Sequence, residues 1–145
     1  MIARDAFVAE VLTYVGTPFE HHGRTPGRGL DCAGVVACAL DHFGEAPPDI
    51  HYRPSPSEAE VFDGLAAATR PIAIEHREPG DVLTFLVGGL VVHMGVYIGV
   101  LESGPVECLV QPMRRRGIIG LTSFDPERSD VRACWRLKVF WGVLA

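Results

Sequence analysis

The chain has 145 residues and a formal net charge of -5 at pH 7, and 48% of its residues are hydrophobic against 21% charged. This length suits one domain, residues 1–145, with a single core, and the composition excludes a disordered chain. The negative charge argues against nonspecific binding to nucleic acid, which depends on clustered lysine and arginine side chains.

Two segments bear on location and partners. The N-terminal segment 1–12 carries Asp5 and Glu10 within its apolar pattern and lacks the core of a signal peptide. No stretch of the sequence is long and apolar enough for a membrane span. We therefore expect synthesis in the cytoplasm and no membrane partner. The basic run 114–116 is interpreted as a solvated loop.

The N-terminal part of the chain predicts a helix and then a loop. Apolar residues at helical spacing predict the helix within 2–15, and Gly16 with Pro18 ends it. The segment 17–30 is rich in glycine and proline, which predicts a loop.

Two further helices are expected after this loop. An apolar run predicts a helix over 32–43 that is terminated by Gly44. Ser57 and Glu60 have the spacing of a capping box, which predicts a third helix through about Thr69.

The part of the chain after Pro71 predicts a sheet. It holds short segments that are rich in β-branched and aromatic residues and separated by turn residues, namely DVLTFLVGG, LVVHMGVYIGV, VECLVQP, RRRGIIGLTSF and VRACWRLKVF. Helices followed by a run of strands favour an α+β domain, in which an antiparallel sheet packs on the helical half.

Cys32 begins the second predicted helix, directly after Asp31. Unpaired N–H groups at a helix start favour a thiolate, so we expect this position to lower the thiol pKa and make the sulfur nucleophilic. The same groups are placed to stabilise an oxyanion, and the small residues Ala33 and Gly34 leave the approach open. Asp31 is expected to cap the helix, because its charge would oppose a thiolate. Taken alone, this pattern favours a buried structural cysteine.

The remaining cysteines give little support for a metal site. Cys38, Cys108 and Cys134 form no Cys-x-x-Cys pair with each other or with Cys32, so a zinc site is not expected. Cys108 and Cys134 lie in predicted strands and are interpreted as small buried hydrophobes. Free thiols fit a reducing compartment.

A nucleophilic cysteine needs a base, and His93 is the candidate among the six histidines. It lies in an otherwise apolar predicted strand, where a lone imidazole is more often a satisfied core histidine. Gly95 leaves space beside it. On the next predicted strand, Gln111 could accept the second imidazole N–H through its amide oxygen, or could equally face solvent.

Four motifs, GTPF, LDCAGVV, EPGDVLTF and VVHMGVYIG, resemble in order and approximate spacing those of the NlpC family of papain-like cell-wall cysteine peptidases. The resemblance extends from Gly16 to about Arg116. It implies a papain-like α+β fold, in which N-terminal helices pack on a mostly antiparallel sheet. It also implies that Cys32, His93 and Gln111 are the catalytic residues.

The activity implied by this resemblance is hydrolysis of an amide bond in the peptide stem of peptidoglycan, next to a D-configured residue. Cys32 would attack the carbonyl carbon, and His93 would accept and return the proton. Such a reaction needs no metal and no organic cofactor. Asp81, in the Pro-Gly-Asp turn, is assigned a structural role at the start of a strand.

The sequence departs from the family pattern at three positions. Phe19 stands where tyrosine is usual, Ala33 stands where serine is usual, and Gln111 stands where histidine is commoner. We interpret Gln111 as an altered orienting residue. By resemblance, Phe19, Asp31, Ala33 and His22 are assigned to substrate binding.

The compact chain, the lack of a signal peptide and the segments QPMRRRGIIGL and WRLKVF resemble the branch found in tail modules of phages and gene-transfer agents. This branch implies phage tail or baseplate proteins as partners, and transport to the wall in a phage-like particle. Two alternatives stay open. One is a catalytically inactive structural component with the same fold, and the other, ranked last, is a thiol acyltransferase.

Overall fold

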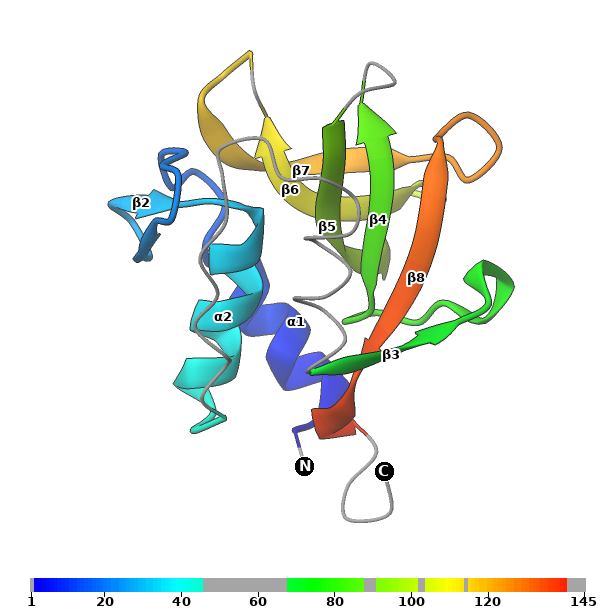
Figure 1. The fold of residues 1–145 in the computed structure, drawn as a ribbon, viewed down its shortest axis with the longest axis horizontal. Coiled ribbons are helices and arrows are strands. Elements are labelled where there is room, and N and C mark those ends of the chain that lie inside the picture. The colour runs from blue at the N-terminus through cyan, green and yellow to red at the C-terminus, as the bar shows by residue number, and fades with distance from the viewer. Residues whose placement is uncertain (1, 46–67, 88–90, 102–103, 114, 141–145) are drawn as a thin grey trace.

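The computed structural model describes residues 2–45, 68–87, 91–101, 104–113 and 115–140. In this part of the chain, two helices lie on one side of a six-stranded antiparallel sheet (Figure 1). The α+β architecture with N-terminal helices and an antiparallel sheet is therefore confirmed. The third predicted helix, with Ser57 and Glu60, falls mostly outside the described residues.

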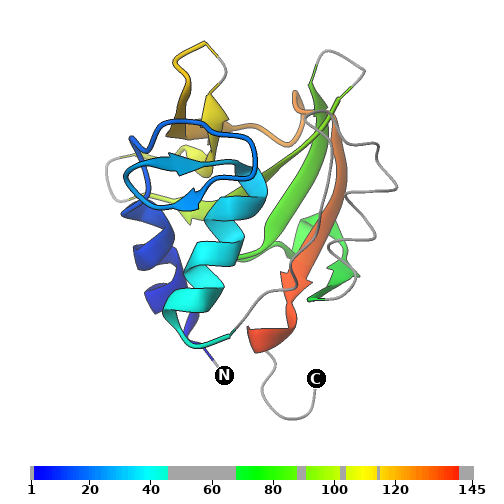
Figure 2. The same ribbon diagram turned by 60° about the vertical axis from the view of Figure 1, so that its left-hand side comes forward.

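The helices α1 (Arg4–Leu12) and α2 (Cys32–His42) lie side by side against the sheet (Figure 2). Phe7 and Val11 of α1 are fully buried, and the buried face of α2 includes Val35, Ala39 and Leu40. The expected end of the second helix is confirmed, because Gly44, with φ of 78°, follows the C-cap residue Phe43.

The large sheet has the strand order β3-β8-β4-β5-β6-β7. Its strands in chain order are β3 (Thr69–Ile72), β4 (Val82–Val87), β5 (Val91–Val100), β6 (Glu107–Met113), β7 (Ile118–Phe124) and β8 (Val131–Leu137). All five strands predicted after Pro71 form. β3 was not predicted, and it corrects the end of the third helix, because Thr69 begins a strand that pairs with Leu137 of β8.

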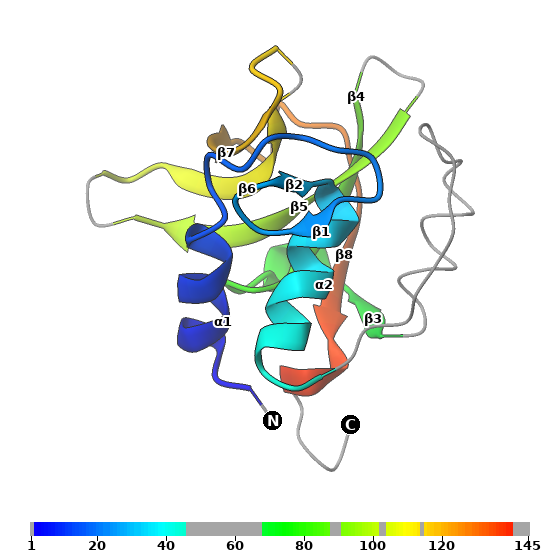
Figure 3. The ribbon, with the colours of Figure 1, turned by 90° about the vertical axis from the view of Figure 1, so that its left-hand side faces the viewer.

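A two-stranded sheet corrects the prediction that segment 17–30 is only a loop. It consists of β1 (Arg24–Thr25) and β2 (Gly29–Leu30), which pair antiparallel in front of the start of α2 (Figure 3). The strands are only two residues long, so their sequence carries no alternating pattern. The segment is joined to β7 by an isolated bridge between Pro18 and Ile118.

The described part of the chain also contains two short 3-10 helices. The 3-10 helix η1 (Ile74–His76) precedes β4, and η2 (Lys138–Phe140) follows β8. Within the described residues, no helix has the length and apolar character needed to cross a membrane. All four cysteines are free thiols, as expected, although Cys108 is only partly buried while Cys134 is buried.

The sheet has a core on each face. Residues such as Val82, Val96 and Val110 pack against the helices. Leu83 and Leu109 belong to a second cluster on the other face. Because side chains alternate along a strand, this arrangement assigns each strand residue to one of the two faces.

Asp81 has the structural role that was predicted for it. Its carboxylate is fully buried and accepts the backbone N–H of Glu78 at 2.8 Å. Arg4 Nη1 donates to it at 3.1 Å, and Arg136 donates through Nε at 3.1 Å and Nη2 at 2.9 Å. One carboxylate therefore joins the start of α1, the turn before β4 and the end of β8.

Candidate active site

Cys32 is held at the start of α2 by a capped helix end. Asp31 has extended backbone angles and its Oδ1 accepts the N–H of Gly34 at 2.7 Å, which confirms the predicted cap. A Cβ added to Gly34 would lie 2.2 Å from the carbonyl oxygen of Gly23. Only glycine therefore allows the preceding segment to lie directly against the first turn of α2.

Asp31 also fixes the segment in front of the helix. The backbone N–H of His22 donates to Oδ2 at 2.8 Å, and Arg24 Nη1 donates to Oδ1 at 2.9 Å. Both carboxylate oxygens of this buried residue are thus bonded within the chain. These contacts support its role as a cap and anchor, and its assignment to substrate binding stays a prediction.

The structure corrects the expected pKa of Cys32, the predicted nucleophile. Burial, and after it the charge of Asp31, raises the pKa of the Cys32 thiol to about 11. Burial of the sulfur dominates although the residue as a whole is only partly buried. Backbone hydrogen bonds from Met94, Ala33 and Cys32 itself lower the pKa, but they do not offset burial. Cys32 is therefore a neutral thiol at pH 7.

The hydrogen bond from Met94 places the sulfur next to β5, directly after His93. Pairing of β5 with β6 begins at Val96 and Val110 among the described residues. The first half of β5 is thus paired with β4, and α2 contacts β5. The helix and the strand that carry the predicted nucleophile and base lie together.

His93 lies partly buried beside β4. It is paired in register with Phe85, and the two rings meet edge to face with centroids 5.3 Å apart. His93 and Gly95 share a face of β5 by strand alternation. A Cβ added to Gly95 would lie 3.3 Å from Cβ of Gln111, so the two residues lie side by side on neighbouring strands. Gln111 is partly buried rather than turned to solvent.

The residues assigned to substrate binding differ in exposure. Phe19 is 48% exposed, and its backbone N–H donates to the carbonyl of Gly117 at 2.7 Å. His22 and Ala33 are partly buried. His22 has a φ of 59°, which is uncommon for a residue with a side chain, and its ring meets that of His21 edge to face at 4.4 Å.

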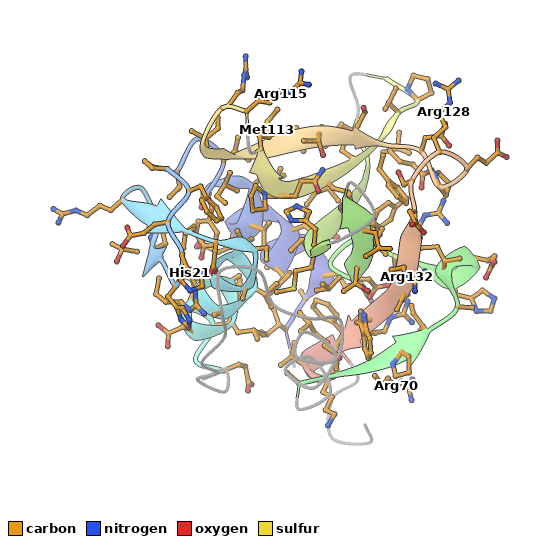
Figure 4. All side chains as sticks on the ribbon, turned by 45° about the horizontal axis from the view of Figure 1, so that its top comes forward. His21, Arg70, Met113, Arg115, Arg128 and Arg132 are labelled. Atoms are coloured by element: carbon orange, nitrogen blue, oxygen red, sulfur yellow. The ribbon has the colours of Figure 1, made fainter. Side chains whose placement is uncertain are left out.

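The other described histidines lie elsewhere. His42 is near the end of α2, where its Nδ1 lies 3.6 Å from Oε2 of Glu10. His76 is exposed in η1. Figure 4 shows His21 beside α2, with Arg70 and Arg132 on the opposite side of the molecule, on β3 and β8. Met113 and Arg115 lie along one edge, where β6 ends.

Comparison with known proteins identifies the domain. The NlpC/P60 family matches residues 16–105, which is more than half of the chain. The chain belongs to the NlpC/P60 family.

Proteins of Mycobacterium tuberculosis and Mycobacterium bovis are similar in sequence, including one named "Probable endopeptidase Rv2190c". Each is 40% identical over 96 residues, which are 66% of this chain and 21% of the relative. The matched region is therefore about a fifth of the relatives' length.

Solved structures show the same NlpC/P60 fold. An NLP/P60 family protein of Staphylococcus aureus, described as similar to lipoprotein, has a TM-score of 0.64 at 20% identity, over 92% of this chain and 41% of that chain. The NlpC/p60 domain of the peptidoglycan hydrolase SagA also has a TM-score of 0.64, at 18% identity, over 94% of this chain and all of that chain.

The NlpC/P60 match includes Cys32 and His93 but ends before Gln111. Two participants at the site were missed by sequence reasoning. The N–H of Met94 could not be found, because a backbone donor leaves no signal in the sequence. Thr122 belongs to none of the four motifs, yet its Oγ1 accepts a hydrogen bond from Nε2 of Gln111 at 2.6 Å.

Proposed function

We propose that this domain is a cysteine peptidase that hydrolyses amide bonds in the peptide stem of peptidoglycan. The observation that carries the proposal is the hydrogen bond from Met94 to the Cys32 sulfur, which sets the thiol next to the strand segment bearing His93. Membership of the NlpC/P60 family supports it, as do the names of the mycobacterial relatives and of SagA.

The raised pKa of Cys32 defines the first step. Because the resting sulfur is a neutral thiol, His93 acts as a general base and takes the proton while Cys32 Sγ bonds to the carbonyl carbon. The N–H groups of Cys32 and Ala33, at the start of α2, are placed to stabilise the oxyanion. In this mechanism the resting enzyme holds a neutral thiol and a neutral imidazole, rather than a thiolate and an imidazolium.

The remaining steps return the enzyme to its starting state. His93 gives the proton to the leaving nitrogen as the C–N bond breaks, which leaves a thioester on Cys32. Water then adds to the thioester carbon and loses a proton to His93. The C–S bond breaks, the carboxylic acid leaves and the thiol is restored. Gln111 orients the imidazole by accepting its other N–H.

Substrate would lie against the segment before α2. Phe19 offers an exposed aromatic surface, and His22 and Ala33 flank the first turn of the helix. Phe19 and Ala33 lack the hydroxyl groups of tyrosine and serine, so apolar contact replaces hydrogen bonding at both positions. The stem peptide is the proposed ligand of this surface.

An inactive structural component with the same fold is the second candidate, and one observation favours it. A thiol whose pKa is raised to about 11 is a weak nucleophile until a base acts on it. If His93 did not serve as that base, the domain would bind stem peptides without cleaving them.

The proposed setting is a phage-like particle, with synthesis in the cytoplasm and tail or baseplate proteins as partners. Support comes from the sequence segments QPMRRRGIIGL and WRLKVF. The first includes the end of β6 and the start of β7, and the second includes the end of β8 and η2. Mass spectrometry of purified particles from the producing cell tests this setting, since the chain must be recovered with tail proteins.

Cleavage of a purified stem peptide tests the hydrolase. We expect wild type to release a new amine and Cys32→Ala to lose at least about a thousandfold in kcat, because no thioester can form. Cys38→Ala is the matched control, since it removes a second thiol from the same helix, and it keeps wild-type activity. Binding without any product from wild type would establish the inactive component instead.

A further inference from the structure

Gln111 is held from the side opposite to β5. Its Nε2 donates to Oγ1 of Thr122 at 2.6 Å, and both side chains are partly buried. In the register of β6 with β7, Gln111 pairs with Gly120 and Leu109 pairs with Thr122. Gln111 and Thr122 are thus diagonal neighbours on one face of the sheet, within reach of a long side chain.

On its other side, Gln111 meets the strand that carries His93. An added Cβ at Gly95 would lie 3.3 Å from both Cβ of Gln111 and the carbonyl oxygen of Val110. His93 is two residues before Gly95 and shares its face of β5. Gln111 therefore lies between Thr122 on β7 and the part of β5 that bears the proposed base.

We propose that Thr122 is a positioning residue, which holds the Gln111 side chain in place beside the strand that bears His93. A primary amide has a donor end and an acceptor end, and only its oxygen can accept an imidazole N–H. Nε2 donates to Thr122, so Oε1 remains available as the acceptor that the proposed mechanism needs. This inference rests on the proposed hydrolase and adds a residue that acts through Gln111.

The chemical reason for Thr122 follows from what stands at position 111. A histidine at this position could still present a ring nitrogen as the acceptor after a change of tautomer. A glutamine whose amide rotates by 180° would instead point its NH2 group at the N–H of His93, and two donors cannot bond. A glutamine at this site therefore acts only when its amide is held in place. The hydroxyl of Thr122 holds it through the hydrogen bond with Nε2, and Thr122→Val removes that hold.

Thr122→Val removes the hydroxyl and keeps the shape and the strand preference of the side chain. We expect kcat for the stem peptide to fall about threefold to tenfold with KM unchanged, the range of one neutral hydrogen bond. Thr122→Ser keeps the acceptor and restores activity to within about twofold of wild type. Ser123→Val, which removes an exposed hydroxyl from the opposite face of β7, leaves kcat unchanged.

A double-mutant cycle separates positioning from a general effect on β7. In a Gln111→Ala background there is no amide to orient, so adding Thr122→Val should change kcat by less than about twofold. An equal loss in both backgrounds would overturn the positioning role, because it would show that Thr122 acts on the sheet rather than through Gln111.

Alkylation of Cys32 by iodoacetamide keeps this test independent of the hydrolase. Thr122→Val should slow alkylation near neutral pH about threefold to tenfold, since the base is less well oriented, and Thr122→Ser should not. If wild type releases no product but this pattern holds, the hydrolase fails and the positioning role stands. If wild type cleaves and Thr122→Val matches it in both assays, the positioning role alone is overturned.

Discussion

Two buried aspartates organise this domain, and they do so over different distances along the chain. Asp31 accepts hydrogen bonds from His22, Arg24 and Gly34, all within nine residues of it. Asp81 accepts from Glu78, but also from Arg4 and Arg136, which lie 77 and 55 residues away. The first carboxylate shapes one helix start, and the second joins three elements.

Each aspartate also lies near a cysteine. Burial, and after it the charge of Asp31, raises the pKa of Cys32 to about 11. Burial, and after it the charge of Asp81, raises the pKa of Cys134 to about 12. The same physics therefore acts at a proposed nucleophile and at a buried cysteine of β8. A perturbed thiol pKa by itself does not identify a catalytic cysteine. The two cysteines differ in that the Cys32 sulfur also accepts a backbone hydrogen bond from Met94, next to the predicted base His93.

Removing the long-range aspartate should have the largest effect. Asp81→Asn removes the charge from a fully buried carboxylate and leaves Arg4 and Arg136 with the exposed Glu78 as their charged partner, so we expect unfolding to require about 3 kcal/mol less free energy. Urea denaturation measures this. Asp125→Asn, which breaks a pair with Arg128 on the exposed surface, is the control and costs at most about 1 kcal/mol. An equal cost for the two variants would contradict the role given to Asp81.

Changing the local aspartate should have a smaller effect on stability and a visible effect on the thiol. Asp31→Asn keeps a good cap but loses the charge and one acceptor, so we expect a loss of about 1 to 2 kcal/mol. Because the charge of Asp31 raises the Cys32 pKa, the midpoint of Cys32 alkylation against pH should move below that of wild type. A midpoint that stays in place or rises would show that this charge does not reach the sulfur.

The smallest effect is expected from Arg24, whose side chain is 35% exposed. Arg24→Met keeps the aliphatic stem but removes the donor to Asp31, and should cost at most about 1 kcal/mol in urea denaturation. Arg28→Met, on the same hairpin, is the matched control and should be neutral. A cost for Arg24→Met as large as that for Asp81→Asn would remove the contrast between the two aspartates.

The same contrast explains what the sequence could predict. The cap at Asp31, the end of α2 near Gly44 and the five strands after Pro71 depend on neighbouring residues, so local patterns indicate them. β3 pairs with the distant strand β8, and β1 and β2 have two residues each, too few for an alternating pattern, so local patterns missed both.

At the candidate site, too, features that depend on local motifs were predicted and features that depend on the folded chain were not. The sequence pointed to Cys32, His93 and Gln111 through motifs and their order, and the structure places their strands and helix together. The direction of the Cys32 pKa was predicted wrongly, because helix position was weighed without the burial that the folded chain imposes. The hydrogen bond between Gln111 and Thr122 depends on strand register, which no motif records.

The neutral state of the Cys32 sulfur has a consequence for durability. Peroxides and disulfides react with thiolates far faster than with protonated thiols, so a sulfur that keeps its proton at neutral pH resists oxidation. In the proposed mechanism, this sulfur gains reactivity only while His93 withdraws its proton. The proposed hydrolase would thereby exchange a permanently reactive sulfur for a long-lived one.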